Sequence, residues 1–231
     1  MCGRFFRHDV SWEEYHSALS ILSVPDSEPP EPAYNIAPTQ SVPIIRIETD
    51  HDSPEEGATI ISPAMWGLVP HWWKKPLSEK KFSTFNAKSE EAADKASFRA
   101  ALKYRHCLIP ASGYYEWSSH KGKKRPYAIG LQNHRWFFFA GLWDRVWIDG
   151  SPLDSFTILT TAANDTLAPL HKRMPIIVGR EHYQDWLNLN READEIVFAA
   201  SPMANTHYWP VGASVGNVRN HGAQLIEEAT L

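Results

Sequence analysis

The stretch CLIPASGYYEW, residues 107–117, is rich in aliphatic and aromatic side chains and predicts a buried β-strand. Further strands are predicted over Pro126–Leu131, Trp136–Leu142, Phe156–Thr161 and Pro175–Val178. Only a few residues join these strands, which favours antiparallel pairing over a βαβ design. We therefore expect a curved, partly closed antiparallel sheet around this stretch.

The N-terminal half adds a helix and a hairpin. Ser11 and Glu14 form a capping-box pattern, which predicts a helix over Trp12–Ser23. Four prolines between residues 24 and 32 predict an extended loop. Strands are expected at Val42–Ile47 and Thr59–Met65 across an acidic turn, and short helices at Ser97–Arg105, Arg180–Leu187 and Ala193–Ala200. The fold class predicted is α+β, as a single domain over residues 1–231.

Composition limits the class of protein. The 231 residues are 43% hydrophobic, enough for a substantial core, and no apolar run approaches the roughly 20 residues that span a bilayer. The N-terminus lacks a signal-peptide pattern, so a cytoplasmic protein is expected. A net charge of -4 argues against coating nucleic acid by bulk electrostatics, so any nucleic-acid contact is expected to be local. Two cysteines alone make neither a disulfide framework nor a zinc site, and Cys107 is expected to be an inert core thiol.

Cys2 follows the initiator methionine and becomes the first residue if Met1 is removed. Its α-amine and thiol would then lie on adjacent carbons, with ordinary pKa values of about 7.7 to 8.0 and about 8.5. Such a 1,2-aminothiol condenses with an aldehyde to an imine and closes to a five-membered thiazolidine. The alternative is an incidental cysteine in a mobile tail. Phe5 and Phe6 favour a terminus that packs into the fold.

Three further segments carry polar or aromatic groups suited to binding. Residues 34–39, YNIAPT, are typical of a turn, and residues 85–90, FNAKSE, are typical of a loop before a helix. Trp72 and Trp73 precede Lys74 and Lys75, and aromatics beside cations suit stacking of unpaired bases. Trp66 is expected in the core. If the segment is extended, Trp72 and Trp73 point to opposite sides.

Glu116 and His171 are candidates for proton transfer. A carboxylate within an aromatic strand is costly to bury, and burial would raise the pKa of Glu116 toward neutrality. His171 stands just before a predicted strand, and histidine titrates near neutral pH. Each residue alone is more typical of a structural role. The basic run at residues 121–125 is expected to be a solvated hairpin tip.

Seven segments in this order resemble one family, the SOS-response-associated peptidases (SRAP). They are MCGR (1–4), YNIAP (34–38), WGLVP (66–70), FNAKSE (85–90), GYYEW (113–117), HKRMP (171–175) and VGNV (215–218). The resemblance covers nearly the whole chain. It implies a protein that recognises abasic sites in single-stranded DNA and crosslinks to them through the trimmed N-terminal cysteine, shielding the lesion.

The resemblance also implies roles for individual residues. Cys2 would be the nucleophile, and Asn86, Glu116 and His171 would assist around the deoxyribose. Lining the DNA path would be Arg4, Asn35, Trp72, Trp73, Lys88 and Arg173. Lys88 departs from the arginine common in the family and loses the planar two-pronged contact. No metal or organic cofactor is implied, and a monomer is expected because a single-site trap needs no second subunit.

Two other functions are compatible with these residues. An N-terminal-nucleophile cysteine peptidase would use Cys2 to attack a peptide carbonyl, including its own leader, which here is only Met1. A single-strand binding module with an incidental Cys2 would bind intact DNA in a salt-sensitive way and form no covalent product. Reaction with abasic DNA and with peptides discriminates among the three.

Overall fold

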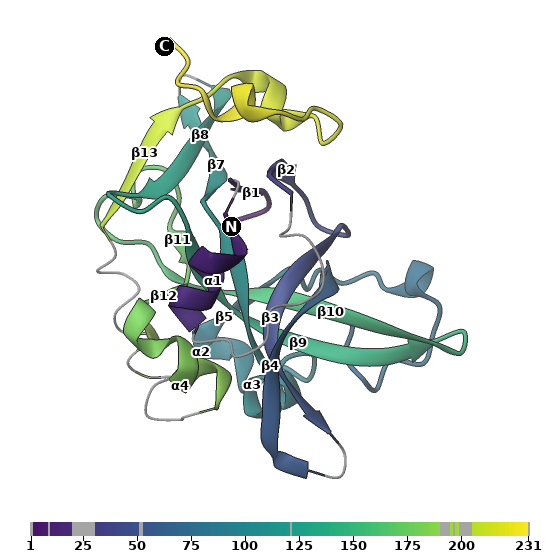
Figure 1. Cartoon of the computed structure of the whole chain (residues 1–231). Helices are drawn as coiled ribbons and strands as arrows, with labels where there is room; N and C mark the ends of the chain where they lie inside the picture. The colour runs from purple at the N-terminus through teal and green to yellow at the C-terminus, as the bar shows by residue number, and fades with distance from the viewer. Residues whose placement is uncertain are drawn as a thin grey trace.

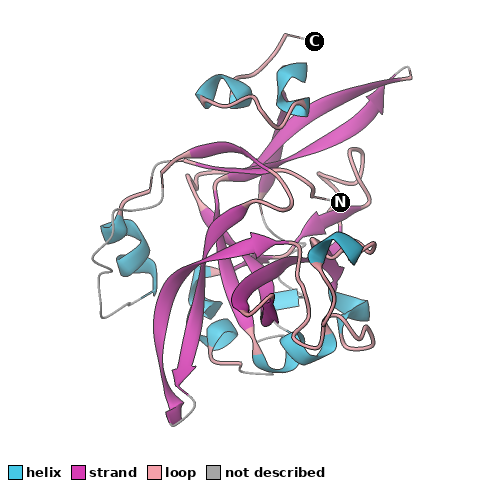
Figure 2. Ribbon diagram, turned by 90° about the vertical axis from the view of Figure 1, so that its right-hand side faces the viewer, coloured by secondary structure: helices cyan, strands magenta, loops and turns pink. Residues whose placement is uncertain are grey.

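Strands are the main regular structure of this chain, and its helices are short segments around them (Figure 2). The computed structural model describes residues 2–8, 10–19, 31–50, 53–120, 122–189, 195, 197–198 and 205–230. The strands are β1 (Phe5–Arg7), β2 (Ala33–Ile36), β3 (Ser41–Asp50), β4 (Ser53–Trp66), β5 (Asn86–Lys88), β6 (His106–Ala111), β7 (Gly113–His120), β8 (Lys123–Leu131), β9 (Phe137–Ile148), β10 (Ser151–Ala162), β11 (Arg173–Pro175), β12 (Ile177–Val178) and β13 (Thr206–Pro210). The helices are α1 (Trp12–Leu19), α2 (Ser89–Ala92), α3 (Arg99–Tyr104) and α4 (Tyr183–Leu187).

Five strands close into a small barrel. β10 pairs with β4, β4 with β3, β3 with β6, β6 with β9, and β9 returns to β10. Closure leaves the barrel strands without a free edge, which removes a site of unwanted pairing. β5 and β11 pair with the end of β10, and β12 pairs with the start of β9, largely beyond the stretches that close the ring. The prediction of an α+β fold with a partly closed sheet is confirmed.

A second sheet lies above the barrel in Figure 1, in the order β13-β8-β7-β1-β2. β1 is an inner strand next to the edge, and it pairs with the edge strand β2 on one side and with β7 on the other. Phe6, at the start of the chain, packs under the C-terminal segment with Val211, Val215 and Leu225. The first residues of the chain are therefore built into the interior of a sheet.

Residues 107–117, predicted as one strand, form parts of two strands in different sheets. The chain bends at Ser112, whose Oγ accepts from the His8 amide at 2.9 Å and whose own amide donates to the Phe6 carbonyl at 2.8 Å. At Gly113 a Cβ atom would overlap the Phe6 ring, so only glycine fits this crossing. The apolar pattern continues through the bend because both strands are buried.

Alternate residues of the barrel strands face two separate cores. Leu108 and Phe138 pack toward the helices, whereas Ile109 and Phe139 pack toward the second sheet. Strands covered on both faces have nearly continuous apolar sequences, which explains the run that dominates residues 107–111.

The N-terminal predictions are confirmed where the structure describes them. Ser11 and Glu14 form the capping box, with the Glu14 amide 3.3 Å from Ser11 Oγ and the Ser11 amide 2.9 Å from Glu14 Oε2. β3 and β4 form the expected hairpin and are longer than predicted. The loop at 24–30 and most of the helix expected at Ala193–Ala200 lie outside the described residues.

Pairing in the barrel is mixed, in contrast to the antiparallel expectation. β10 runs parallel to β4 and to β5. The connections from β4 and from β5 to β10 pass through several other elements, and such long connections are what parallel neighbours require. Among the described residues, no helix has the length and apolar character needed to cross a bilayer.

Candidate functional site

Cys2 lies inside the protein. It is fully buried and shares an apolar cluster with Phe5, Trp66 and Tyr114. Its Sγ atom lies 3.6 Å from the Arg4 carbonyl oxygen. The pairing of β1 on both sides explains this burial, because a residue three positions before Phe5 is held close to the sheet. The sequence-based expectation of a packed terminus is confirmed.

The electrostatic surroundings of Cys2 keep its thiol protonated. Burial raises the pKa of the Cys2 thiol, and the negative charge of Glu116 raises it further. Glu116 is itself 5% exposed, on β7. The carboxylate and the thiol therefore act on each other within the protein interior. Thiolate, the nucleophilic form, is disfavoured here unless a nearby group accepts the proton or stabilises the charge.

Asn86 holds Cys2 from the opposite sheet. Its Nδ2 donates to the Cys2 carbonyl oxygen at 2.6 Å. The pairing of β5 with β10 sets this position, with Asn86 opposite Ile158. The Asn86 Oδ1 atom is buried and has no hydrogen-bond partner among the described residues. One end of the amide fixes Cys2, and the other end remains as an acceptor beside it.

Tyr114 is a polar neighbour of Cys2 that the sequence did not single out. It is 1% exposed and lies two residues before Glu116 on β7, so both side chains point to the same face of the strand. Tyr115 points to the other face, where its hydroxyl donates to the Tyr34 carbonyl at 2.8 Å. The i, i+2 spacing from Glu116 was the signal that could have identified Tyr114.

His171 lies in the connection before β11. Its Nδ1 lies 3.0 Å from the Arg173 amide nitrogen and 3.1 Å from the Arg173 carbonyl oxygen, so the backbone of Arg173 holds the ring. Leu170 and Met174, on either side, pack against the cluster that contains Cys2. β11 and β5 also flank β10, with Pro175 and Lys88 both opposite Thr160. His171 is thus placed by a segment that borders the Cys2 cluster.

Arg173 and Lys88 both have acidic partners. Arg173 Nη2 lies 2.9 Å from Glu90 Oε2 and donates to the Thr160 carbonyl at 2.6 Å, with the side chain only 12% exposed. The guanidinium hydrogen bond lowers the pKa of Glu90 to about 2. Lys88 Nζ lies 2.5 Å from Glu91 Oε1, and both of these side chains are exposed. The Lys88 pair is therefore held less firmly than the Arg173 pair.

Arg4 and Asn35 fasten the C-terminal segment beside the N-terminus. Arg4 Nη1 donates to Asn35 Oδ1 at 2.8 Å and to the Val215 carbonyl at 3.0 Å. Asn35 is buried, and its Nδ2 donates to the carbonyls of Asn217 and Asn220 at 2.9 and 3.1 Å. These bonds connect three of the segments on which the family resemblance rests. Asn35 is thus committed to partners within the protein.

Trp72 and Trp73 lie in a turn after β4. The Trp73 amide donates to the Pro70 carbonyl at 2.8 Å, so the segment is not extended and the two rings do not alternate in direction. Their centroids are 6.4 Å apart, and Trp73 also contacts the Phe82 ring at 5.5 Å. Trp72 is 44% exposed. An aromatic surface is therefore available at this turn.

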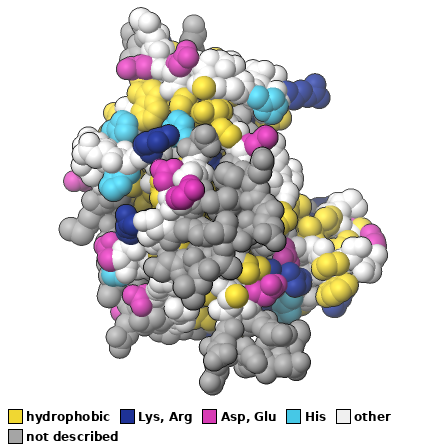
Figure 3. Space-filling view, viewed as in Figure 1, with side chains coloured by type: hydrophobic (Ala, Val, Ile, Leu, Met, Phe, Trp, Pro, Cys, Tyr) yellow, Lys and Arg dark blue, Asp and Glu magenta, His cyan; other side chains and the backbone are white. Residues whose placement is uncertain are grey.

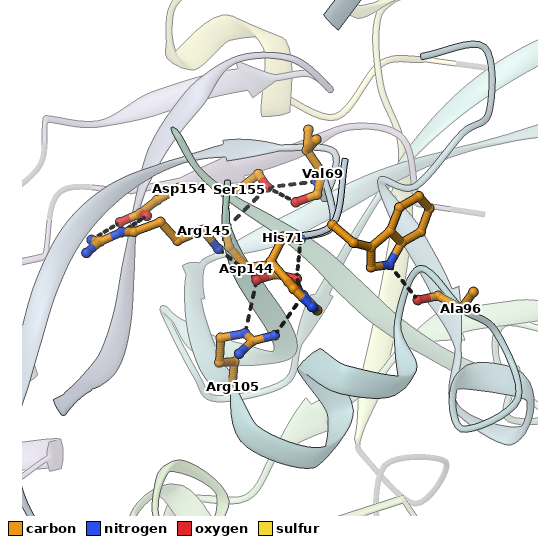
Figure 4. Close-up of polar contacts among 9 residues, drawn as sticks. Val69, His71, Ala96, Arg105, Asp144, Arg145, Asp154 and Ser155 are labelled. Carbon is orange, nitrogen blue, oxygen red and sulfur yellow. Dashed lines mark hydrogen bonds and ion pairs between the residues drawn. The ribbon is translucent and has the colours of Figure 1, made fainter. Parts of the chain in front are cut away.

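Asp144 anchors the turn that carries these tryptophans, as Figure 4 shows. Its buried carboxylate accepts from the His71 amide at 2.9 Å and contacts His71 Nδ1 at 3.0 Å. Arg105 Nε pairs with the other oxygen at 3.1 Å, and the Arg145 amide donates to that oxygen at 2.9 Å. Nothing in the sequence around Asp144 indicated this role, because its partners come from three separate segments.

Replacing Asp144 by alanine is expected to destabilise the protein by about 2 kcal/mol, because it leaves two backbone donors and one cation without their acceptor. Urea unfolding measures the loss, with Asp165→Ala, an exposed position, as the control. Equal stability of the two variants would contradict the anchoring role.

A pocket of about 490 Å³ adjoins this region. Phe85, directly before Asn86, is one of its walls. Its other lining residues include Thr39, Trp66, Lys80 and Phe82. On the molecular face in Figure 3, Lys and Arg side chains are scattered among acidic ones, with no broad basic area among the described residues. Aromatic walls with few cations suit a base better than a long phosphate backbone.

Known proteins are similar to this chain over almost its full length. The profile of the family "SOS response associated peptidase (SRAP)" matches residues 1–218. The chain is 30% identical to the Escherichia coli abasic site processing protein YedK, over 98% of this chain and 99% of the relative. It is 33% identical to the Bacillus subtilis abasic site processing protein YoqW, with the same coverage.

Solved structures also share the fold of this chain. A crystal structure of a protein from Bordetella bronchiseptica superposes with a TM-score of 0.72 at 28% identity, covering 91% of this chain and all of that one. Sequence and fold thus lead to one conclusion, and the chain belongs to the SOS response associated peptidase (SRAP) family.

Proposed function

We propose that this protein recognises abasic sites in single-stranded DNA and forms a thiazolidine crosslink to them through Cys2 after removal of Met1. The observation that carries the proposal is the fixed, buried Cys2, held through its carbonyl by Asn86 at 2.6 Å and subject to the charge of Glu116. The names of the relatives, abasic site processing proteins, support the choice of lesion.

The chemistry balances without a cofactor. The α-amine of Cys2 adds to the C1′ aldehyde of the ring-opened sugar, and loss of one water gives an imine. The thiol then adds across the carbon–nitrogen double bond, with sulfur bonding to carbon and the thiol proton ending on nitrogen. The net change is one thiazolidine and one water for each aminothiol and aldehyde. A closed thiazolidine protects the strand from β-elimination.

Three side chains are proposed to assist these reaction steps. Glu116 accepts and returns protons as the imine forms and closes, because its carboxylate acts directly on Cys2. Asn86 offers Oδ1 to a hydroxyl of the sugar or to the new amine. His171 donates a proton to promote opening of the sugar ring, with its Nδ1 edge held by the backbone of Arg173.

The proposed DNA path crosses the surface between the tryptophan turn and β5. Trp72 and Trp73 stack on unpaired bases, and the pocket beside Phe85 has room for a base next to the lesion. Lys88 and Arg173 exchange their acidic partners for phosphates, Lys88 more readily because its pair is exposed. Arg4 and Asn35 act by holding the C-terminal segment at the edge of this path.

Intact mass spectrometry tests the proposal. The protein is mixed with an abasic single-stranded oligonucleotide, and the product is expected to weigh the sum of the Met1-free protein and the DNA minus one water. A product that retains Met1, or the absence of a covalent product, would contradict it. Cleavage of added peptides without a DNA adduct would support the peptidase instead.

The single-strand preference is expected to depend on Trp72. Wild-type protein should crosslink an abasic single strand faster than the same site in a full duplex. Trp72→Ala should lower the single-strand rate about tenfold at limiting DNA, because base stacking on an aromatic ring contributes roughly 1–3 kcal/mol. Gel analysis of crosslinking rates on both substrates measures the effect.

Trp147 offers a matched control for this variant. It is 64% exposed and lies near the tip of the β9–β10 hairpin, opposite Pro152. Trp147→Ala removes the same ring from a surface outside the proposed path and should leave both rates unchanged. Equal effects of the two substitutions, or equal wild-type rates on single strand and duplex, would remove the stacking argument.

A further inference from the structure

The hydroxyl of Tyr114 is buried without a hydrogen-bond partner among the described residues. The side chain is 1% exposed, and its ring packs edge-on against Phe139 at 6.0 Å. A buried hydroxyl without a partner costs free energy, whereas phenylalanine would fill the same apolar space without that cost. Such a group needs an explanation other than packing.

Tyr114 faces the reactive end of the chain. It pairs with Phe5 across β1 and β7, and it belongs to the same buried cluster as Cys2. Glu116, two residues along β7, shares this face of the strand. Tyr114, Cys2 and Glu116 therefore converge from two adjacent strands.

Among the described residues, no side chain donates a hydrogen bond to the Cys2 sulfur. The sulfur lies 3.6 Å from the Arg4 carbonyl oxygen, which accepts hydrogen bonds and cannot donate one to a thiolate. Glu116, when ionised, is also an acceptor and repels the thiolate. Among the described contacts, the Asn86 Nδ2 group donates to the Cys2 carbonyl oxygen and not to its sulfur. A phenol hydroxyl, by contrast, can donate to sulfur.

We propose that Tyr114 is a positioning residue for ring closure, with its hydroxyl donating a hydrogen bond to the Cys2 sulfur as the thiol ionises. The inference rests on the proposed function. The S–H bond breaks and its proton passes to the Glu116 carboxylate. The sulfur electron pair then forms the bond to the imine carbon, the carbon–nitrogen π electrons move to nitrogen, and Glu116 returns the proton there.

Electrostatics keep Tyr114 in the donor form. Burial raises the pKa of the Tyr114 phenol well above its ordinary value, and the charges of Cys2 and Glu116 raise it further. The charged groups that act on Cys2 are Glu116 and the amino terminus. These effects favour the protonated phenol, which is the form that donates a hydrogen bond.

Two adjacent tyrosines allow a matched experiment. Tyr114→Phe removes the hydroxyl without a partner, and Tyr115→Phe removes one that donates to Tyr34 on the opposite face. For each protein without Met1, the thiolate absorbance of Cys2 is titrated as the difference from the same protein with Cys2→Ser. Thermal unfolding and the pH profile of crosslinking to abasic DNA are measured in parallel.

For Tyr114→Phe we expect thiolate to appear at higher pH, because hydrogen bonding to the charged form lowers a pKa and its loss raises it. Ring closure near neutral pH should slow about tenfold, as expected for a hydrogen bond to a charged group, and recover at higher pH. Its melting temperature should be unchanged or higher. Tyr115→Phe should melt lower and keep the wild-type titration.

An unchanged Cys2 titration in Tyr114→Phe would overturn the inference. A lower melting temperature together with a wild-type pH profile would also overturn it, because that combination indicates a structural role. The titration contains no DNA. If wild-type protein forms no adduct while Tyr114→Phe still shifts the titration, the proposed function fails and only the hydrogen bond from Tyr114 to the thiolate stands. If adducts form and the Cys2 titration of Tyr114→Phe is unchanged, only the role of Tyr114 is disproved.

Discussion

Replacing Cys2 by alanine is expected to lower the yield of heat-stable adduct on abasic single-stranded DNA by about 1000-fold or more, because the nucleophile is removed outright. An α-amine remains after Met1 removal, so an imine can still form, but no sulfur is present to close it. The open imine hydrolyses or promotes β-elimination. Denaturing gels should therefore show nicked DNA in place of the adduct, and Cys2→Ser should behave in the same way.

Cys107→Ala is the control for this experiment. Cys107 is the other cysteine of the chain, fully buried on β6, and burial raises the pKa of its thiol as it does for Cys2. Cys107→Ala should leave the adduct yield unchanged, since an internal cysteine has no free α-amine. Borohydride reduction adds a second readout, because it traps an imine but not a thiazolidine. The same heat-stable adduct from Cys2→Ala would disprove the assignment of the nucleophile.

Glu116→Gln is expected to slow crosslinking by about 100-fold, within the range of general acid–base catalysis. Glutamine keeps the shape of the side chain but cannot accept and return a proton. The same substitution removes the charge that raises the pKa of the Cys2 thiol, so thiolate should form at lower pH in the variant. A slower reaction despite a more easily ionised thiol would separate proton transfer from thiol activation.

Single-turnover rates, with protein in excess over DNA, measure how far Glu116→Gln slows crosslinking. The final yield should approach that of the wild type, because the bonds formed are the same. Glu181→Gln is the control, since Glu181 is exposed and lies beside His182, outside the Cys2 cluster and the proposed DNA path. A rate for Glu116→Gln within about twofold of the control would exclude a proton-transfer role, given the size of such effects.

Local patterns were predicted well where their cause is local. The capping box at Ser11 and Glu14 depends on residues three apart, and it forms as expected. The β3–β4 hairpin follows from two apolar strands across a polar turn. The burial of Trp66 and Cys107 follows from their apolar neighbours. Each of these features depends on a few consecutive residues.

Features that depend on distant partners were missed or only partly predicted. The bend at Ser112 exists because Phe6 and His8 occupy the crossing, and the parallel pairing of β10 with β5 depends on a segment about 70 residues away. The local sequence predicts no special role for Asp144, yet its carboxylate holds His71 and Arg105. Asn35 was expected along the DNA path, and its amide is bonded to Arg4 and the C-terminal segment.

The order of short motifs, with an aminothiol-capable Cys2 at their head, was sufficient to place this chain in its family, because side-chain chemistry and spacing are written directly in the sequence. Tertiary structure alone decided what surrounds that cysteine. Burial, the 2.6 Å bond from Asn86 and the neighbouring Glu116 and Tyr114 come from strands far apart in the chain, and a thiol's reactivity depends on such neighbours in space rather than on those in sequence.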